Sequence, residues 1–569
     1  MLNFYDFEVF KHDWLVVIIN PVEKSETVIV NDKTKLEEYY EAHKNEIWVG
    51  YNSQHYDQYI LKGILCDFNP KEINDFIIAK GKQGWQFSSV LRKIPLNNYD
   101  VMYRNDGGLK SLEGFMGNNI KETSVPFDID RKLTVDEINE TIKYCRHDVE
   151  QTVEVFLERK SDFDAQMGLI TMFKLPLSNI GRSKAQLSAH ILNAVRPMES
   201  RDDEFDITFP DTLRIKKYQH IVDWYKNPDN RDYSKSLTTD VAGVETLFGW
   251  GGIHSARKKY CREGYFINMD VASLYPSLMI QYNLHSRNIV DPQKFVDIYQ
   301  NRLKYKAAKN PLQLPLKTLL NSTYGAMKDK NNQLYDPLMA NNVCIHGQLL
   351  LLDLMEKLEP YAEIIQSNTD GILIRMPDGK DIDEWYELID DIVFEWEQRT
   401  RLKMEFDEYR KIFQKDVNNY VVIDASGHYK SKGSYVKKLT NLDYDLPIVN
   451  KAMVDYMVGN VPVEQTINEC TELKMFQKIV KRSGKFIRVW HNGKSYDEKC
   501  FRVFASTASS DTAITKQKEG KDTTEKFANT PENCFIVNGD VDERRIPSKL
   551  NRQWYIVMAK ERLSQFGVM

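Results

Sequence analysis

The chain has 569 residues, of which 42% are hydrophobic and 28% are charged, and its formal net charge at pH 7 is −5. A chain of this length is too long for one hydrophobic core and should divide into several domains. The net charge excludes a polycation, although local basic surfaces could still bind nucleic acid. The seven cysteines form no CxxC pairs, which argues against a disulfide framework and against a zinc site.

The sequence carries no signal for a membrane or for export. Its longest apolar runs are too short to span a bilayer. The N-terminus lacks the basic start and the long apolar stretch of a signal peptide. We therefore expect a protein of the reducing cytoplasm that has no membrane partner.

The N-terminal segment LNFYDFEVF predicts a short strand that carries two carboxylates. Asp6 and Glu8 are two positions apart, so both side chains lie on the same face of such a strand. Taken alone, a pair of this kind is more often a solvent-facing edge than a functional site.

Two later segments add further acidic groups. IWVGYNSQHYDQYIL predicts a strand followed by a helix, with Asn52 and Asp57 near the point where the helix begins. VDEINETIKYCRHDVEQTVEVFLER predicts an amphipathic helix on which Tyr144 and Asp148 share one face. Four carboxylates with a helical tyrosine are what two-metal phosphodiester hydrolysis requires, with divalent ions ~4 Å apart. Oxygen ligands favour Mg²⁺ or Mn²⁺ over zinc.

In their order and spacing, these segments resemble the three motifs of the proofreading 3′–5′ exonuclease domain of family B DNA polymerases, an RNase H-like domain of the DEDD type. By this resemblance the metal ligands would be Asp6, Glu8, Asp57 and Asp148. Tyr144 would orient the attacking water. The stretch LKSLEGF resembles, more weakly, a segment that grips the single-stranded primer end. The implied contacts to that strand are Asn52, Ser111, Leu112 and Phe115.

A second acidic pair lies in the C-terminal half. EIIQSNTDGILIR predicts a β-hairpin with Asp370 in its Asp-Gly turn, which by itself would most often be only a turn. YFINMDVASLYPSLMI predicts a strand that ends at Asp270, followed by a polar loop that could hold a phosphate through backbone N–H groups. Together, Asp270 and Asp370 could clamp two metal ions while a primer 3′-hydroxyl attacks the α-phosphate of a nucleotide.

The segment NRLKYKAAKNPLQLPLKTLLNSTYGAM, between these aspartates, predicts a helical hairpin that is interrupted near Pro311 and Pro315. Its inner face would offer cations to a triphosphate and a tyrosine to the base. Each of these cations, taken singly, is more often a solvated surface residue.

DxxSLYPS, Kx₃NSxYG and NTDG occur in the order of motifs A, B and C of family B polymerases, so the resemblance extends over most of the chain. It implies primer extension with dNTPs, and two Mg²⁺ or Mn²⁺ ions at each active site. The implied metal ligands of the second site are Asp270, Val271 and Asp370. The implied nucleotide-binding residues are Ser273, Leu274, Tyr275, Arg302, Lys306, Lys317, Asn321 and Tyr324. Among them, Tyr275 would exclude a 2′-hydroxyl. Further DNA contacts would be Gly251, Gly252, Gly325, Tyr420, Lys430 and Lys432.

The sequence departs from the family pattern at several positions. Asn368 replaces the usual first aspartate of motif C, which predicts an active enzyme with an altered metal preference. Asn418 stands where a lysine is usual, and Phe248 replaces the tyrosine of the YxGG-like stretch. The segment between Asp270 and Lys317 is too short for the two insertions of protein-primed phage polymerases. We therefore expect a compact phage-type enzyme that extends nucleic-acid primers.

The expected fold class is a multidomain α/β protein with an RNase H-like exonuclease domain and a right-hand polymerase of palm, fingers and thumb. The expected domains are the exonuclease at 1–165, a linker with the first part of the palm at 166–290, the fingers at 291–345, the second part of the palm at 346–415, and the thumb at 416–569. Within the thumb, residues 506–530 are expected to form a mobile loop.

The expected partners of a monomer in the host cytoplasm are primer-template DNA, dNTPs and other replication proteins. Two alternatives stay open from the sequence. One is a DNA-binding replication factor without polymerase activity, and the other is an exonuclease whose C-terminal half only holds DNA.

Overall fold

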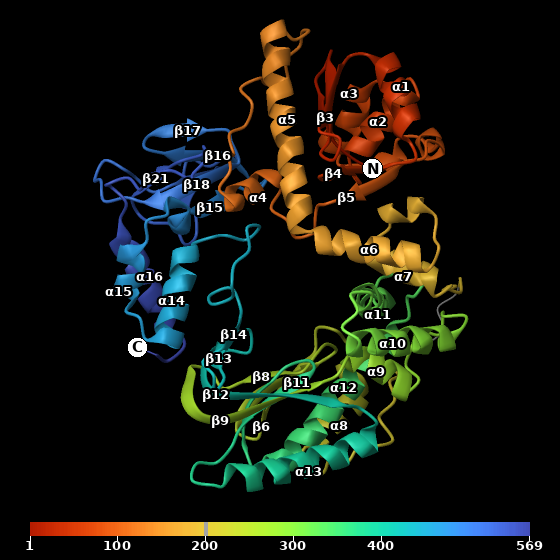
Figure 1. The fold of residues 1–569 in the computed structure, drawn as a ribbon, viewed down its shortest axis with the longest axis vertical. Coiled ribbons are helices and arrows are strands. Elements are labelled where there is room, and N and C mark those ends of the chain that lie inside the picture. The colour runs from red at the N-terminus through yellow and green to blue at the C-terminus, as the bar shows by residue number, and fades with distance from the viewer. Residues whose placement is uncertain (199–202, 569) are drawn as a thin grey trace. The chain divides into compact units, whose positions relative to one another are not determined.

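The computed structural model of the chain describes residues 1–198 and 203–568. They divide into two compact units, each built from three segments of the chain. Unit 1 consists of Met1–Arg182, Leu439–Pro447 and Cys470–Trp554, and unit 2 of Ser183–Lys438, Ile448–Glu469 and Tyr555–Met569. Helices occur with several sheets (Figure 1), which confirms the expected α/β multidomain class.

Unit 1 begins with a five-stranded sheet in the order β3-β2-β1-β4-β5. Its strands are β1 (Leu2–Val9), β2 (Trp14–Asn20), β3 (Ser25–Val30), β4 (Ile47–Gly50) and β5 (Asn97–Asp100). β1, β2 and β3 pair antiparallel, whereas β4 is parallel to both β1 and β5. The C-terminal ends of the parallel strands β1 and β4 therefore lie at the same edge of the sheet. Asp6, Glu8 and Asp57 lie near this edge.

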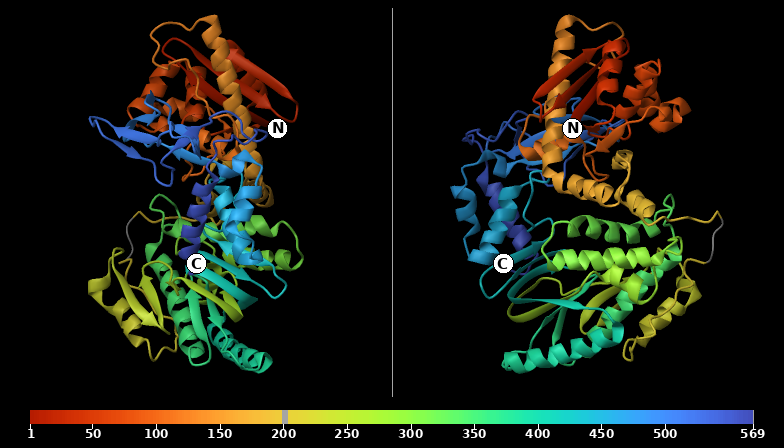
Figure 2. Two further views of the ribbon diagram at one scale, coloured as in Figure 1. Left: turned by 90° about the vertical axis from the view of Figure 1, so that its left-hand side faces the viewer. Right: turned by 45° about the vertical axis from the view of Figure 1, so that its right-hand side comes forward.

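Helices cover both faces of this sheet. The flanking helices are α1 (Lys33–His43), α2 (Asp57–Leu65), α3 (Pro70–Asn74) and the long α5 (Val135–Glu158). Tyr5 and Phe7 of β1 pack in one core with buried residues of α1, α2 and α3. Phe4 points the other way, and its ring lies 5.2 Å from that of Phe156 on α5, which runs beside the sheet in Figure 2. Because side chains alternate along a strand, Asp6 and Glu8 lie on the α5 face.

The rest of unit 1 contains two helices and two small sheets. The helices are α4 (Leu109–Met116) and α6 (Lys160–Met172). One sheet has the order β15-β18-β21 and the other β17-β16-β19-β20. Their strands are β15 (Lys478–Lys481), β16 (Phe486–His491), β17 (Lys494–Tyr496), β18 (Cys500–Ala505), β19 (Thr515–Lys518), β20 (Thr524–Lys526) and β21 (Cys534–Ile536). The buried guanidinium of Arg502 donates to the backbone carbonyls of Gly114 and Asn118, which ties these sheets to α4.

The expected mobile loop over residues 506–530 is wrong, because β19 and β20 form an antiparallel ribbon within it. Its strands lack the apolar alternation that marks a strand in sequence. They are held instead by the backbone ladder and by Lys516, whose ammonium lies 4.2 Å from the ring centre of Phe486 and 5.3 Å from that of Phe527. Cation–π packing of this kind leaves no periodic hydrophobic signal.

Unit 2 is built around a nine-stranded sheet in the order β14-β13-β12-β9-β11-β10-β8-β7-β6. The strands are β6 (Ser236–Val241), β7 (Val244–Gly249), β8 (His254–Ala256), β9 (Tyr260–Val271), β10 (Glu363–Ser367), β11 (Gly371–Arg375), β12 (Met404–Asp416), β13 (Asn419–Ile423) and β14 (Tyr429–Lys432). The helices are α7 (Lys184–Ile191), α8 (Gln219–Lys226), α9 (Leu274–Gln281), α10 (Pro292–Ala307), α11 (Gln313–Met327), α12 (Pro337–Leu358), α13 (Ile382–Thr400), α14 (Pro447–Gly459), α15 (Val463–Glu469) and α16 (Arg552–Ser564).

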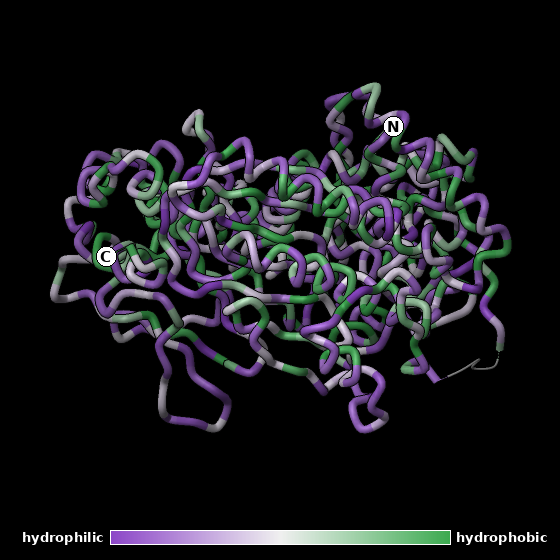
Figure 3. Tube along the Cα trace, turned by 90° about the horizontal axis from the view of Figure 1, so that it is seen from below, coloured by the Kyte–Doolittle hydropathy of each residue, from purple (hydrophilic) through white to green (hydrophobic). Residues whose placement is uncertain are grey.

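Helix α12 is the central core helix of unit 2. It is long and apolar enough to cross a membrane, and 94% of its most apolar window is buried inside the protein. Trp396 of α13 packs against it and donates to the carbonyl of Leu350. By contrast, the loops that project from the trace in Figure 3 are mainly hydrophilic. The apolar surface of α12 is therefore accounted for by packing against its own unit.

Candidate active sites

Asp270 and Asp370 lie beside each other at the ends of paired strands in unit 2. In the antiparallel register of β9 and β11, Gly371 lies opposite Asp270. The backbone N–H of Val271 donates to the carbonyl of Asp370 at 2.7 Å. Burial, and next the charge of Asp370, raise the pKa of Asp270. The structure therefore brings together two carboxylates that are a hundred positions apart in the sequence.

Gly371 makes this close approach possible. A Cβ atom added at this position would lie 1.9 Å from Oδ1 of Asp270, well inside van der Waals contact. Gly252 has a similar function in the FGWGG stretch, since its Cβ would lie 2.6 Å from Oγ1 of Thr369. Both glycines leave room around the turn that carries Asp370.

Asn368 closes that turn. Its Oδ1 accepts hydrogen bonds from the backbone N–H groups of Asp370 at 3.2 Å and Gly371 at 2.8 Å. Its own N–H donates to the carbonyl of Gly371 at 3.0 Å. Asparagine and aspartate both make such turns. Relative to an aspartate, Asn368 can therefore keep the turn while it carries one negative charge fewer.

A cavity of about 700 Å³ includes both aspartates in its lining. It contains all of the predicted nucleotide-binding residues, together with one predicted metal ligand and one predicted DNA contact. These are Val271, Ser273, Leu274, Tyr275, Arg302, Lys306, Lys317, Asn321, Tyr324 and Gly325. Ser273 adopts the left-handed region with φ of 53°, where the chain turns from β9 into α9. The sequence motifs of three separate segments thus meet in one cavity.

The helices α10 and α11 supply cations to this cavity. Arg302 is 7% exposed and donates to Oγ of Ser273, while its Nε is buried without a hydrogen-bond partner among the described residues. Lys306 pairs with Glu405 at 2.6 Å. The positive side chains of the cavity lie on the helical hairpin and the negative ones on the sheet, and the Lys306–Glu405 pair joins the two.

Glu405 is a cavity residue that the sequence analysis missed. It lies opposite Asp270 in the register of β9 and β12. Its segment MEFDEY carries acidic residues at alternate positions, which is the only sequence signal that could have indicated it.

Gln348 and Tyr420 lie beside predicted site residues of unit 2. Gln348 of α12 is buried, and its amide nitrogen donates to the carbonyls of Gly249 at 2.8 Å and Gly251 at 2.5 Å. On β13, Tyr420 has a raised pKa, mainly through burial and also through the charges of Asp270 and Asp370. Nearby, β14 carries the two predicted DNA-binding lysines. Lys432 lies opposite Tyr420 in the strand register, and Lys430 pairs with Asp407 at 2.8 Å.

The second acidic site lies in unit 1, between β1, α2 and α5. The backbone N–H of Phe7 donates to Oδ1 of Asp57 at 3.1 Å, which fixes the start of α2 against β1. Burial is the largest cause of a raised pKa at all four predicted carboxylates, namely Asp6, Glu8, Asp57 and Asp148. The pKa rises to about 7 at Asp57 and to about 6 at Asp148. Repulsion from the other members raises the pKa of Asp6 and Glu8 further, so the structure brings all four together.

Lys110 is a cation of this site that the sequence analysis missed. Its ammonium contacts Asp148 at 2.7 Å and Glu113 at 3.1 Å, and it lies 4.7 Å from the ring centre of Tyr144. The charge of Lys110 lowers the pKa of Asp148 against the larger effect of burial. Its place directly before Ser111, in a segment already singled out, could have indicated it.

The predicted primer-end contacts of unit 1 are largely enclosed. Ser111 and Leu112 are 4% and 2% exposed, and Phe115 packs beside a cluster that includes Ile479. Asn52 has φ of 61°, and its N–H donates to Asp100 at 2.9 Å. Contacts of these four residues with DNA stay predictions.

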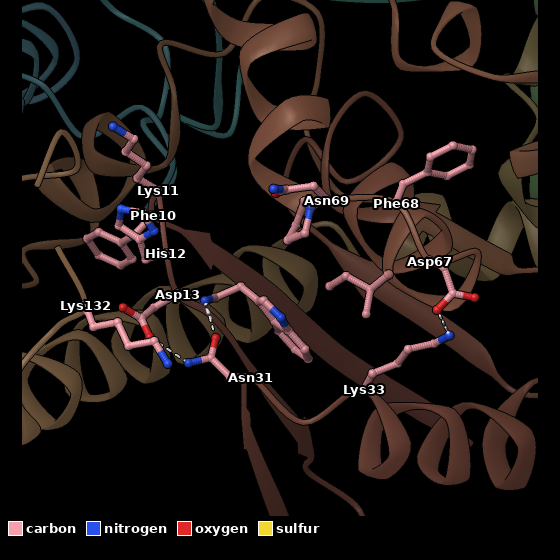
Figure 4. A pocket seen from close by; sticks show the side chains of 13 residues that line it. Phe10, Lys11, His12, Asp13, Asn31, Lys33, Asp67, Phe68, Asn69 and Lys132 are labelled. Atoms are coloured by element: carbon pink, nitrogen blue, oxygen red, sulfur yellow. Dashed lines mark hydrogen bonds and ion pairs between the residues drawn. The ribbon is translucent and has the colours of Figure 1, made fainter. Parts of the chain in front are cut away.

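A further cavity of about 590 Å³ lies at the β1–β2 hairpin of unit 1 (Figure 4). Several cations line it, and two of them pair with acidic neighbours. Asp130 pairs with Lys11 at 2.5 Å and contacts His12 at 3.1 Å. Lys33 pairs with Asp67, as the dashed line in Figure 4 marks. This cavity therefore does not present the concentrated charge of the first one.

The chain is similar in part to known DNA polymerases. No family model matches the chain. DNA polymerase 1 of Saccharolobus solfataricus is 24% identical over 294 residues, which cover 43% of this chain and 32% of that protein. The chain therefore matches about a third of the length of this curated relative. The solved structure of the family B DNA polymerase from the hyperthermophilic archaeon Pyrobaculum calidifontis aligns with 99% of this chain and 77% of that chain, with 13% identity and a TM-score of 0.42. By sequence, the chain is therefore similar to part of a DNA polymerase.

Proposed function

We propose that the chain is a template-directed DNA polymerase that extends a nucleic-acid primer with dNTPs, and that a second site removes nucleotides in the 3′–5′ direction. One observation carries the proposal. Asp270 and Asp370 meet in a cavity that also contains all of the predicted nucleotide-binding residues. If these cations and turn residues were ordinary surface residues, we would not expect all of them to lie around the same pair of carboxylates.

The donor set at the synthesis site fits a divalent metal. Two carboxylates face the same cavity, and their repulsion contributes to the raised pKa of Asp270, which a bound dication would relieve. Asp270, Asp370 and the carbonyl of Val271 would hold Mg²⁺ or Mn²⁺. Two bound ions would supply activation of the primer 3′-hydroxyl and neutralisation of the charge that develops on the phosphates.

The protein's own residues would orient the nucleotide. Arg302, Lys306 and Lys317 would bind the triphosphate, and the unpartnered Nε of Arg302 offers a donor for it. The rings of Tyr275 and Tyr324 lie 4.1 Å apart and would form the wall beside the sugar and base. Phosphates of the duplex would be bound without sequence preference.

The unit 1 site has the residues for phosphodiester hydrolysis. Asp6, Glu8, Asp57 and Asp148 would hold two divalent ions, because the four carboxylates are buried and repel one another although Lys110 pairs with Asp148. Burial raises the pKa of Tyr144, which keeps its hydroxyl protonated so that it can donate a hydrogen bond to water. Lys110 would hold Asp148 in its ionised form.

We assign a domain to each group of elements according to these proposed roles. The five-stranded sheet with α5 would be the RNase H-like exonuclease domain, the nine-stranded sheet the palm, and α10 with α11 the fingers. Residues 416–569 would supply the thumb. We also propose a compact phage-type enzyme that serves viral DNA replication in the host cytoplasm, with other replication proteins as partners. The short segment between Asp270 and Lys317 supports the compactness and the use of nucleic-acid primers.

Primer extension tests both activities in one assay. Wild-type protein with Mg²⁺ should lengthen a labelled primer on a template when dNTPs are present and shorten it when they are absent. Asp370→Asn should abolish lengthening and retain shortening, whereas Asp6→Asn should do the reverse. Equal effects of the two substitutions on both activities would refute two separate sites. A wild-type protein that only shortens the primer would support an exonuclease alone, and one that does neither would support a DNA-binding factor.

A further inference from the structure

Cys344 of α12 lies next to the two tyrosines of the unit 2 cavity. It is 3% exposed and does not line the cavity itself. Its thiol and the hydroxyl of Tyr324 form a hydrogen bond. The ring of Tyr275 packs in turn against that of Tyr324, with the ring centres 4.1 Å apart. Three side chains from three helices therefore contact one another in series, from Cys344 through Tyr324 to Tyr275.

A cation contacts the Cys344–Tyr324 pair from the other side. Lys328 donates to Sγ of Cys344 at 3.6 Å, and its ammonium lies 5.4 Å from the ring centre of Tyr324. It also donates to the carbonyl of Trp250 at 3.5 Å. Lys328 thus links this pair to the glycine-rich FGWGG stretch. The thiol has a partner on each side, Tyr324 and Lys328, which restricts the directions in which the hydroxyl of Tyr324 can point.

The hydrogen bond to Cys344 limits what the tyrosines present to the cavity. A buried hydroxyl without a partner is costly, so Tyr324 is held in the orientation that keeps its bond to the thiol. The rings of Tyr275 and Tyr324 lie 4.1 Å apart with an interplanar angle of 34°, and rotation of one would displace the other. Loss of the thiol would free the hydroxyl of Tyr324 to turn toward the cavity and would loosen the ring of Tyr275 that packs against it.

We propose that Cys344 is a positioning residue that sets the sugar specificity of the synthesis site by holding Tyr324 and, through the contact between the two rings, Tyr275 in one orientation beside the incoming nucleotide. This inference rests on the proposed polymerase function. A 2′-hydroxyl is rejected when the wall beside the sugar is rigid and offers it no partner. Release of Tyr275 would weaken both conditions for ribonucleotides and would change little for deoxyribonucleotides.

Single-nucleotide incorporation with dATP and with ATP tests the proposal. Cys344→Val fills a similar volume but cannot hydrogen-bond, and it should lower the ratio of kcat/KM for dATP over ATP about tenfold, the equivalent of one lost hydrogen bond. The change should come from a lower KM and a higher kcat for ATP, with both constants for dATP nearly unchanged. Cys344→Ser keeps a hydrogen-bonding atom and should restore most of the ratio.

The control is Cys261→Val, which changes a cysteine on β9 that is absent from the cavity lining. An unchanged ratio in Cys344→Val would overturn the proposal, as would an equal loss in the serine and valine variants. If the valine variant does not fold, Cys344→Ala must show the same loss, and an unchanged ratio there is equally decisive. A wild-type protein that incorporates neither nucleotide would instead refute the polymerase function.

Discussion

The two acidic sites differ in how they balance negative charge. In unit 1, four carboxylates are crowded into a buried site, and their pKa values are raised mainly by burial. In unit 2, three carboxylates share an open cavity with three cations that come from a separate helical hairpin. The first arrangement would concentrate charge for metal ions, whereas the second would leave room for a triphosphate that carries its own negative charge.

This difference follows from what each proposed reaction must bind. Hydrolysis at unit 1 needs ligands for metal ions and a water molecule, so the protein itself must supply most of the negative charge. Synthesis at unit 2 would bring in a nucleotide whose phosphates would supply further ligands for the ions. Fewer carboxylates and more cations are then needed. The following changes should separate the two sites, beginning with the largest effect.

Gly371→Ala should eliminate synthesis. The added Cβ would lie 1.9 Å from Oδ1 of Asp270, so either the strand pair or the carboxylate must move. Because a shift of about 1 Å in a catalytic group can cost 100-fold in rate, we expect at least this loss of primer extension. Shortening of the primer in the absence of dNTPs should continue at the wild-type rate. Gly484→Ala is the control, since its Cβ would meet no described heavy atom within 4 Å. Normal extension by the Gly371 variant would show that the two strands are not held as closely as the register indicates.

Lys110→Met should slow primer shortening by 10- to 100-fold and leave extension unchanged. The substitution removes the partner of Asp148 and of the buried Glu113, and loss of such supporting groups typically costs this much. Lys110→Arg should recover part of the rate. Lys143→Met changes an exposed lysine one position from Tyr144 and should have no effect. If both methionine variants shorten the primer equally well, the pairing of Lys110 with Asp148 and Glu113 does not contribute to activity.

The sequence predicted those parts of the sites that depend on local pattern. Strand alternation put Asp6 and Glu8 on one face, and the Asp-Gly turn at Asp370 is the β10–β11 hairpin. Glu405 and Lys110 were not predicted, because their place in the sites depends on strand register and on side-chain contacts between distant segments. Asn368 shows the same limit, since its missing charge was evident from the sequence but its two turn hydrogen bonds were not.

The stability of unit 1 should fall as the pH rises. In the folded state the pKa of Asp57 is about 7 and that of Asp148 about 6, above the ~3.9 of an unfolded aspartate. Their contribution is therefore complete below about pH 4 and is lost as the pH rises through 6 and 7. Asp57→Asn removes one of these titrations and should raise the melting temperature at about pH 8 without metal, by roughly 2–4 °C for each kcal/mol regained.

Melting curves from pH 5 to 8, with and without Mg²⁺, measure this effect. Mg²⁺ should stabilise the wild type at the upper end of the range and should stabilise Asp57→Asn less. Asp522→Asn, in the exposed turn between β19 and β20, should follow the wild type. A melting temperature of the wild type that rises with pH over this range would contradict the raised pKa values.

The smallest expected effect is that of restoring a negative charge at position 368 in unit 2. Asn368→Asp can accept the same two backbone hydrogen bonds, so the turn at Asp370 should persist and extension should stay within about threefold of wild type. The added charge should lower the Mg²⁺ concentration that gives half-maximal extension. Asn368→Ala loses both hydrogen bonds, and at about 1 kcal/mol for each we expect a loss of about tenfold or more in rate. Steady-state extension across a Mg²⁺ series distinguishes the two variants. If alanine matched the wild type, the turn would hold Asp370 without help from position 368, and the amide would matter only through the charge it lacks.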